Sequence, residues 1–392
     1  MTSSVLFAYI RSMASPRNAF TPLYIPITNI PSSGIQLRPE FIELFKYANI
    51  ESRHLITLDD LPDLSTIESQ LPPENTKWIL VDHNALQGQL GKIYSKRVSG
   101  VVDHHDDERK VPDNTGDEPR IIEKSGSCTS LVANYCRQAW DLLSDSATSS
   151  GAAHAQGDSL SDDDAVVKSW DAQVAHLGLA SILIDTTNLQ SEDKTTEHDR
   201  KAAEYLEAKI KLCTKFSANF DRDKFYEAID SAKKDIAGLE LQDILRKDYK
   251  QWDEKSRKLG VSSVVKPIEF LQQKAKDEAQ SDFSTDDAFL DALKRFCEER
   301  ELDLYALMTT STSPEGEFRR ELLVWAFNDA GITSAKQFAS DSHDELGLGE
   351  WRGAGGEGYD SGGDGYWRRV WWQKNVQHSR KRVAPLLREA MR

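Results

Sequence analysis

Short runs of large apolar residues alternate with amphipathic stretches along the first half of the chain. The runs at 77–84 (KWILVDHN), 97–105 (RVSGVVDHH) and 118–127 (EPRIIEKSGS) have the length and composition of buried strands. The stretches at 38–50 and 128–143 carry apolar residues at helical spacing. Strands that alternate with helices are typical of an α/β domain with a mostly parallel sheet, and we expect that fold here.

A second pattern of strands and helices occupies the C-terminal part of the chain. It begins with the apolar run at 259–271 (LGVSSVVKPIEFL) and resumes at 317–327 (EFRRELLVWAF). The residues between the two patterns are rich in charged or small polar side chains. This composition is typical of segments that connect domains and not of a hydrophobic core. We therefore predict an N-terminal domain over 1–200 with a disordered insertion at about 144–164, a helical linker over 201–222, and a smaller α/β domain over 223–392.

The distribution of charge limits the partners of the protein. The formal net charge is −15, so the surface as a whole does not favour nucleic acid. The segment 367–392 is nevertheless strongly basic, and a cationic patch in an acidic protein can attract a small or linear anion. No apolar run approaches the roughly 20 residues of a membrane-spanning helix. We expect neither a nucleic-acid nor a membrane partner, and the sequence does not determine the oligomeric state.

The cysteines and the first residues indicate the cellular compartment. Cys128, Cys136, Cys213 and Cys297 form no CxxC pair. The first residues place no basic segment ahead of an apolar one, as a secretory signal would. Reduced thiols in a cytoplasmic protein are therefore expected.

Acidic residues and histidines follow two successive predicted strands. Asp82 ends one strand, Asp103 with His104 and His105 ends the next, and Asp185 ends a helical run. Ligands of parallel sheets gather beyond the carboxyl ends of the strands. Carboxylates with imidazoles suit Mn²⁺, Mg²⁺ or Co²⁺, and two such ions can activate water and bind phosphoryl oxygens. A single Asp-His pair is more often a turn or a helix cap, but two pairs at successive strand ends favour a metal site.

The order of these motifs resembles that of the DHH phosphoesterase superfamily. The chain carries VDHN at 81–84, VVDHHDDE at 101–108, SGSCTSLVANY at 125–135 and ILIDTTNLQSEDKTTEHD at 182–199. Upstream, PITNIPSSGIQLRPEFIELFKYANI is similar to the fungal exopolyphosphatase branch. LMTTST, FRREL and HSRKRVAPLL resemble the smaller C-terminal domain shared by exopolyphosphatases, prune-type proteins and manganese-dependent pyrophosphatases. The resemblance runs along the whole chain and implies a mostly parallel-sheet DHH domain followed by an α/β substrate-binding domain.

The resemblance implies a role for each residue of the predicted metal site. Asp82 would bridge two metal ions, His104 would bind one of them, and Asp185 would be a further shared ligand. His105 would face the phosphate under attack, and Asp103 would hold the loop or orient a histidine. The implied cofactor is Mn²⁺ or Mg²⁺, with Co²⁺ also possible.

The resemblance also implies that Lys250, Arg380 and Lys381 bind phosphate oxygens. Arginine offers a planar fork and lysine a mobile point charge, and both complement a polyanion. Without the resemblance, each of the three residues would be interpreted as a solvated surface cation. Ser127 offers a hydroxyl and a backbone N–H at the start of a predicted helix, where either an anion site or a simple helix cap is expected.

One motif of the family is not found in the sequence. The family's chains open with a strand and a D-x-D-S loop, directly followed by a helix that is similar to SSVLFAYI at 3–10. We expect Met1 to be an internal methionine of a longer chain, which an in-frame D-x-D-S upstream of it would support and a stop codon there would contradict. With Asp82, His104 and Asp185 alone, a two-metal site is under-coordinated. We therefore expect little Mn²⁺-dependent hydrolysis from the 392-residue chain.

The resemblance implies an exopolyphosphatase, which removes terminal phosphate from inorganic polyphosphate and releases orthophosphate. Two alternatives remain open at this point. The same architecture could hydrolyse pyrophosphate or a cyclic nucleotide, which relative rates on the three substrates would distinguish. The chain could also be a non-catalytic interaction protein built on a hydrolase fold, in which case a tight Mn²⁺ site would be absent.

Overall fold

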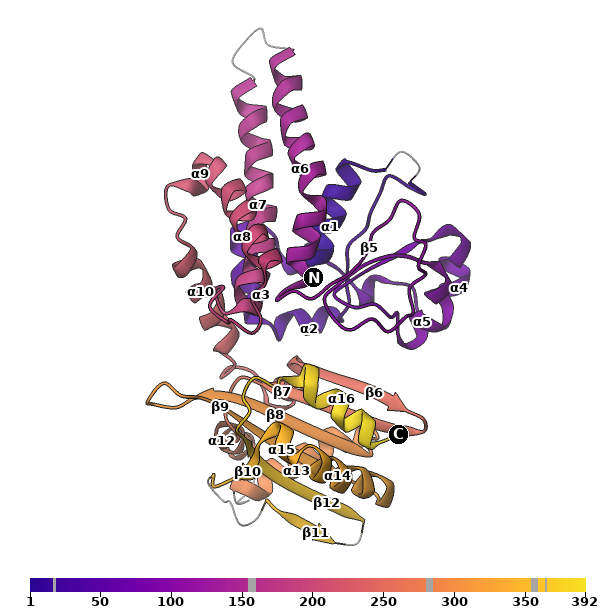
Figure 1. Ribbon diagram of the computed structural model, residues 1–392, viewed down its shortest axis with the longest axis vertical. Coiled ribbons are helices and arrows are strands. Elements are labelled where there is room, and N and C mark those ends of the chain that lie inside the picture. The colour runs from indigo at the N-terminus through magenta and orange to yellow at the C-terminus, as the bar shows by residue number, and fades with distance from the viewer. Residues whose placement is uncertain (17–18, 154–159, 280–284, 354–358, 364) are drawn as a thin grey trace. The chain divides into compact units, whose positions relative to one another are not determined.

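A computed structural model gives the structure of the protein (Figure 1). It describes residues 1–16, 19–153, 160–279, 285–353, 359–363 and 365–392, without the side chains of 146–153, 160–164 and 285–286. The chain divides into two units, Met1–Lys233 and Lys234–Arg392. The sequence predicted that the second domain begins at residue 223. The division falls later because Phe225 and Ile229 are buried in the core of the first unit.

The first unit contains the parallel sheet that the sequence predicted. Strands β3 (Trp78–Val81), β4 (Val98–Asp103) and β5 (Arg120–Ile122) pair in that order, and both pairings are parallel. A separate parallel pair joins β1 (Ile27–Thr28) to β2 (Ile56–Thr57). Because β3 and β4 are parallel neighbours, their carboxyl ends lie at the same edge of the sheet.

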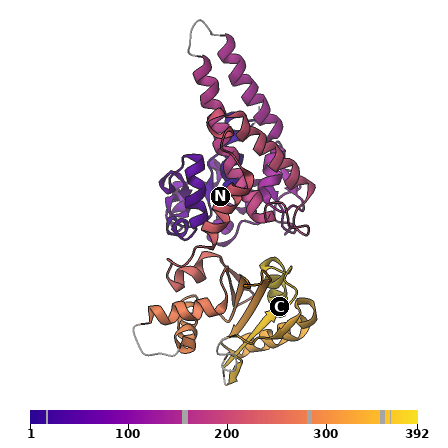
Figure 2. The ribbon, with the colours of Figure 1, turned by 90° about the vertical axis from the view of Figure 1, so that its left-hand side faces the viewer.

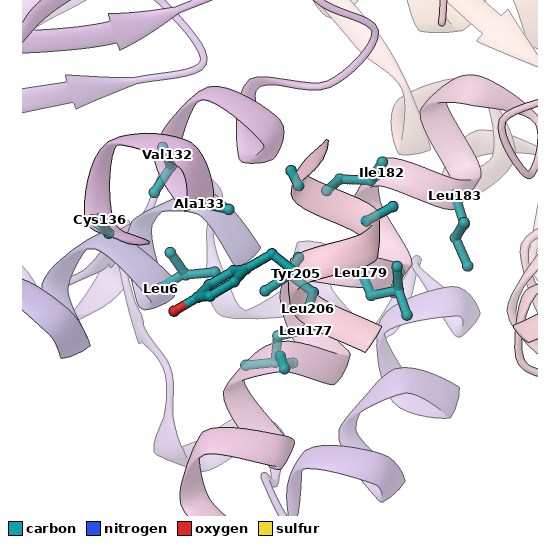
Figure 3. Close-up of a cluster of buried hydrophobic side chains, with 14 of the residues drawn as sticks. Leu6, Val132, Ala133, Cys136, Leu177, Leu179, Ile182, Leu183, Tyr205 and Leu206 are labelled. Atoms are coloured by element: carbon teal, nitrogen blue, oxygen red, sulfur yellow. The ribbon is translucent and has the colours of Figure 1, made fainter. Parts of the chain in front are cut away.

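Four helices enclose the core of the first unit. They are α1 (Thr2–Met13), α6 (Cys128–Ala153), α7 (Leu160–Thr186) and α8 (Glu197–Leu212). Figure 3 shows side chains from all four in one buried cluster, among them Leu6, Val132, Leu179 and Leu206. Helices α6 and α7 pack along each other, as the two views in Figures 1 and 2 show. The other helices of this part of the chain are α2 (Ser32–Gln36), α3 (Pro39–Ala48), α4 (Ile67–Gln70), α5 (Gly88–Tyr94), α9 (Thr214–Ser217) and α10 (Arg222–Lys234).

Two segments differ from the sequence prediction. The predicted linker at 201–222 contains most of α8, whose Ala202, Leu206 and Ile210 are fully buried in the core. Most of its charged residues lie on the outer face of an amphipathic helix, which explains why its composition resembled a linker. In the predicted insertion at 144–164, α6 extends to Ala153 and α7 begins at Leu160, while 154–159 lie outside the described residues.

His176 of α7 is buried in an aromatic cage in the first unit. The rings around it belong to Tyr47, Phe216, Phe220 and Phe225. Burial lowers the pKa of His176 below its usual value, although the contact of its Nδ1 with the carbonyl of Ala172 opposes this. The folded state therefore holds the neutral ring more readily than the unfolded chain does.

The lowered pKa of His176 predicts a pH-dependent stability. Its contribution is complete above about pH 6.5, the pKa of an unfolded histidine, and is lost as the pH falls towards the folded pKa. We expect the free energy of unfolding in urea to be lower at pH 5.5 than at pH 7.5. His176→Phe should reduce that difference, whereas His54→Gln, at an exposed site, should leave it unchanged. If the free energy of unfolding depends equally on pH in the wild-type protein and both variants, His176 is not the source of that dependence.

The second unit is a mixed sheet with helices on both faces. Its strands run in the order β10 (Leu348–Glu350), β12 (Tyr366–Gln373), β9 (Phe318–Ala326), β8 (Leu304–Thr312), β7 (Arg257–Val264) and β6 (Tyr249–Glu254), and β11 (Ser361–Gly363) pairs with β12. Strands β7 and β8 are parallel, and the other described pairs are antiparallel. The α/β class predicted for this domain is therefore confirmed.

Each face of the second sheet has its own hydrophobic core. One core joins the sheet to α11 (Leu241–Lys247), α12 (Ile268–Glu278) and α13 (Thr285–Glu298). The other joins it to α14 (Asp329–Asp341), α15 (His343–Leu346) and α16 (Arg380–Ala390). None of the helices in the described part of the chain has the length and hydropathy needed to cross a membrane.

Candidate metal centre

Asp82 lies directly after β3, where the backbone makes a sharp turn. Its φ is 66°, in the left-handed region that aspartate adopts more readily than most residues, and its N–H donates to the carbonyl of Val102 at 3.1 Å. This turn places the Asp82 carboxylate beside the end of β4. The carboxylate is 60% exposed, so it remains open to a ligand.

His104 has one ring nitrogen bound by the protein and the other directed at Asp82. Nδ1 lies 3.0 Å from the carbonyl oxygen of Ser125, which can only accept, so this nitrogen carries the proton. Nε2 of the neutral ring is then an acceptor, and it lies 3.2 Å from Oδ1 of Asp82. Two acceptors at this distance repel unless a proton or a cation lies between them. The pair is therefore suited to a metal ion.

Asp103 anchors the turn that follows β4. The side chain is fully buried, and its Oδ1 accepts hydrogen bonds from the N–H of His104 at 2.8 Å and from that of His105 at 3.3 Å. The same oxygen lies 2.8 Å from Nδ1 of His105. Its Oδ2 accepts from the amide of Asn84 at 2.6 Å. Asp103 thus orients both histidines, and its role in a metal site stays a prediction.

His105 lies closer to the predicted ligands than the sequence indicated. Because its Nδ1 faces Asp103, its Nε2 is available on a ring that is 31% exposed. One donor atom each from Asp82, His104 and His105 lie within 4.8 Å of one another, which makes these residues a group able to hold a metal ion. His105 can therefore contact either a metal ion or a phosphate.

The histidines also affect the acids beside them. Partial desolvation favours the neutral form of Asp82, but the hydrogen bond and positive charge that His104 provides when it is protonated, together with His105 and the terminal amino group, lower its pKa to about 2. Burial likewise favours neutral Asp103, but hydrogen bonds from His105 and Asn84 lower its pKa below the usual value. Both carboxylates are therefore ionised at neutral pH, as metal ligation or orientation of a histidine requires.

Asp185 occupies the last turn of α7 and is not one of the three-residue group. Its surface is exposed, but neighbouring protein groups displace enough water to raise its pKa above the usual value. A hydrogen bond from the side chain of Ser127 opposes that rise, and Asp82 and His104 are close enough to affect its charge. Asp185 therefore lies near the site and stays a predicted ligand.

The predicted anion site at the start of α6 already has an acceptor. The N–H groups of Gly126 and Ser127 donate to the carboxylate of Asp199, at 2.9 and 3.1 Å. Asp199 is fully buried and also accepts from the hydroxyl of Ser130 at 2.6 Å. These N–H groups are thus not free for substrate, and only the hydroxyl of Ser127, which bonds Asp185, points towards the site.

Asp199 also holds the loop that contacts the candidate metal ligand His104. Ser125, at the start of this loop, provides the carbonyl oxygen that fixes the proton on Nδ1 of His104. Outer partners of this kind orient metal-binding histidines. The sequence suggested no role for Asp199 or Asn84, because their contacts with Gly126, Ser127 and Asp103 join residues far apart in the chain.

The predicted phosphate-binding residues lie in the second unit. Arg380 begins α16 and pairs with Asp248, its Nη2 lying 2.7 Å from Oδ1 and its Nη1 donating to the carbonyl at 2.7 Å. Lys250 is exposed on β6, and Lys381 is exposed on the first turn of α16. All three stay predicted substrate ligands, although Arg380 would have to share its guanidinium with Asp248.

The fold and the site together define a class of protein. A parallel-sheet unit carrying Asp-His motifs at its strand ends is followed by a mixed-sheet unit, and residues 227–390 match the family model described as the DHHA2 domain. Over the whole chain, the fold is similar to the crystal structure titled "Methanococcus jannaschii putative family II inorganic pyrophosphatase". The TM-score is 0.56 at 17% identity, covering 100% of this chain and 94% of that one. The class is that of two-domain DHH-type phosphoesterases.

Relatives identify the family within this class. The chain is 30% identical over 390 residues to the "Putative exopolyphosphatase" of Schizosaccharomyces pombe, covering 100% of this chain and 87% of that protein. It is 24% identical to "Exopolyphosphatase PRUNE1" of Rattus norvegicus, covering 100% of this chain and 72% of that protein. It is 27% identical over 241 residues to the "Probable manganese-dependent inorganic pyrophosphatase" of Lactobacillus helveticus, covering 61% of each. The chain belongs to the exopolyphosphatase-like family of the DHH superfamily.

Proposed function

We propose that the protein is a metal-dependent hydrolase of terminal phosphoanhydride bonds in inorganic polyphosphate, releasing orthophosphate. The observation that carries the proposal is the pair of acceptors formed by Asp82 and His104, 3.2 Å apart, with the other nitrogen of His104 fixed by Ser125. The carboxylate of Asp82 and the neutral imidazole of His104 suit Mn²⁺ or Mg²⁺, and His105 and Asp185 would add further ligands. Relatives named exopolyphosphatase and manganese-dependent pyrophosphatase support a phosphoanhydride substrate.

The residues of the first unit would position the reacting groups. A divalent ion at this site would lower the pKa of a bound water molecule and neutralise charge on phosphoryl oxygens. Asp82, His104 and Asp185 would hold the metal, and Asp103 would keep the rings of His104 and His105 in place through the contacts described above. His105 would present Nε2 to a phosphate oxygen. Its Nδ1 faces an ionised carboxylate, so the ring can donate from Nε2 when it is protonated.

The second unit would supply the cationic contacts to the substrate. Lys250, Arg380 and Lys381 belong to one sheet and the helix that packs on it. An arginine can bind two phosphate oxygens at once, whereas a lysine follows a mobile chain as a point charge. Binding of a polyanion would compete with Asp248 for Arg380.

The compartment proposed for the protein is the cytoplasm. Cys128, Cys136, Cys213 and Cys297 are all free thiols and all buried. Free cysteines are common where thiols stay reduced. Fractionation of cells that express the tagged protein tests this proposal, and recovery in a membrane or secreted fraction would contradict it.

Relative hydrolysis rates test the proposed substrate. The protein, assayed as the longest chain its transcript encodes, is expected to release phosphate from long polyphosphate in the presence of Mn²⁺ at least about tenfold faster than from pyrophosphate or cyclic AMP. A faster reaction with pyrophosphate, which the pyrophosphatase relatives make the second candidate, would replace the proposed substrate. No metal-dependent release from any of the three would favour the non-catalytic alternative.

A further inference from the structure

Arg319 and Arg320 are neighbours on β9 with different surroundings. Arg319 pairs with Glu317, its Nη2 lying 2.9 Å from the carboxylate. Arg320 is half-buried and forms no ion pair with any carboxylate in the described part of the chain. Its Nε donates to the carbonyl of Val376 at 2.5 Å, and the ring of Phe318 lies 5.1 Å from its guanidinium.

The position of Arg320 is unfavourable for a cation. Burial lowers its pKa below the usual value, and no acidic partner among the described residues offsets the lost hydration. Buried charges in proteins are normally paired. The bond to Val376 requires only a neutral donor, so it does not account for the charge. The two Nη atoms have no protein acceptor among the described residues, so both can donate hydrogen bonds to one bound anion.

Arg320 lies on the same face of the sheet as the predicted phosphate ligands. It pairs with Thr310 on β8, two residues from the pair Leu322 and Met308. Because side chains alternate along a strand, Arg320 points to the face where Leu322 packs with α16. Val376, which Arg320 holds, belongs to the loop that leads into α16 and its Arg380.

Arg320 is separated across the sheet from the residues predicted to bind the terminal phosphate, which are Lys250, Arg380 and Lys381. The guanidinium of Arg380 contacts the carbonyl of Asp248, which also accepts from the N–H of Ser263 on β7. Strand β9 lies two strands away from β7, so their backbones are roughly 10 Å apart across the sheet. A single phosphoanhydride link is shorter than this strand separation, whereas a chain of several phosphates extends across it.

We propose that Arg320 forms a second phosphate subsite, which binds an internal phosphate of a linear polyphosphate several links from the end held by Lys250, Arg380 and Lys381. The proposal rests on the polyphosphate substrate proposed above and adds to it a determinant of chain length. Arg320 contributes to the binding of long chains and nothing to the binding of short ones. The proposed subsite requires no second arginine that lacks a carboxylate partner.

Equilibrium binding of long polyphosphate and of tripolyphosphate tests the subsite. Arg320→Gln is expected to weaken binding of the long chain about tenfold or more, because one charge-assisted bidentate contact is lost. Its affinity for tripolyphosphate should stay within about twofold of the wild-type value. Arg320→Lys, which keeps the charge but not the fork, should give an intermediate loss. The matched control is Arg319→Gln on the same strand, which should leave both affinities unchanged.

The outcomes separate the subsite from the substrate on which it rests. If the wild-type protein binds long polyphosphate and both Arg320 variants bind it equally well, the subsite is wrong and the proposed substrate stands. Equal weakening for both chain lengths would place Arg320 at the terminal phosphate and also overturn the subsite. Failure of the wild-type protein to bind either polyphosphate would overturn both proposals. Urea unfolding of each variant checks that the comparison is made between folded proteins, and Arg320→Lys serves if Arg320→Gln does not fold.

Discussion

Replacing His104 with alanine is expected to weaken the binding of Mn²⁺ by about 100-fold or more. His104 is 5% exposed, its Nδ1 is committed to Ser125, and its Nε2 faces Asp82 at 3.2 Å. The substitution removes a nitrogen ligand and leaves Asp82 without its partner. Loss of an outer partner alone lowers metal affinity about 10- to 100-fold, so loss of a ligand should lie at or beyond the upper end. Isothermal titration with Mn²⁺ measures the effect.

A second histidine of the same unit provides the control for His104. His198 is 42% exposed, pairs with Glu123 at 3.3 Å, and is not one of the three-residue group. His198→Ala should bind Mn²⁺ with the wild-type affinity. If the two alanine variants bind Mn²⁺ equally, His104 is not a ligand. An unchanged urea midpoint in both would show that neither result reflects unfolding.

Replacing Asp199 with alanine is expected to lower the free energy of unfolding by about 3 to 5 kcal/mol, because a buried donor left without an acceptor costs about 1 to 3 kcal/mol. The carboxylate of Asp199 accepts from two N–H groups before α6, from the hydroxyl of Ser130, and from both the N–H and the hydroxyl of Thr196. Asp199→Asn keeps the shape and one acceptor oxygen, so its loss should be smaller. Urea unfolding followed by circular dichroism measures both.

Asp199→Ala should also weaken the metal site, because the carbonyl of Ser125 would no longer be held beside His104. Asp193, an exposed acid a few residues earlier, provides the control, and Asp193→Ala should change neither stability nor Mn²⁺ affinity. A loss below about 1 kcal/mol for Asp199→Ala would show that water replaces the carboxylate. It would also remove the proposed support of the loop.

The grouping of Asp82 with His104 could be predicted from the sequence because the signal for it is local. Asp82 and Asp103 each follow an apolar strand directly, and parallel pairing of β3 with β4 necessarily brings the two strand ends together. The position of His105 was less predictable. Whether its ring joins His104 or faces away depends on the hydrogen bond to Asp103, and sequence spacing alone does not determine that bond.

Other features depend on contacts between distant parts of the chain. The N–H groups before α6 appeared free in the sequence, but Asp199, about 70 residues later, accepts from them. The charged stretch at 201–222 appeared to be a linker because most charged residues of α8 lie on its exposed face, whereas Ala202, Leu206 and Ile210 are buried. Likewise, nothing in the dipeptide Arg319-Arg320 indicates that Arg319 has an acidic partner whereas Arg320 has none in the described part of the chain.

The measurement that tests the metal centre most directly is pulsed electron paramagnetic resonance of bound Mn²⁺. If Asp82 and His104 hold the ion, the spectrum of the wild-type protein should show coupling to a histidine nitrogen, with a change on ¹⁵N labelling of histidine. That coupling should be lost or strongly reduced in His104→Ala and retained in His198→Ala. Bound Mn²⁺ without nitrogen coupling, or with the same coupling in His104→Ala, would contradict the assignment of this site as the metal centre.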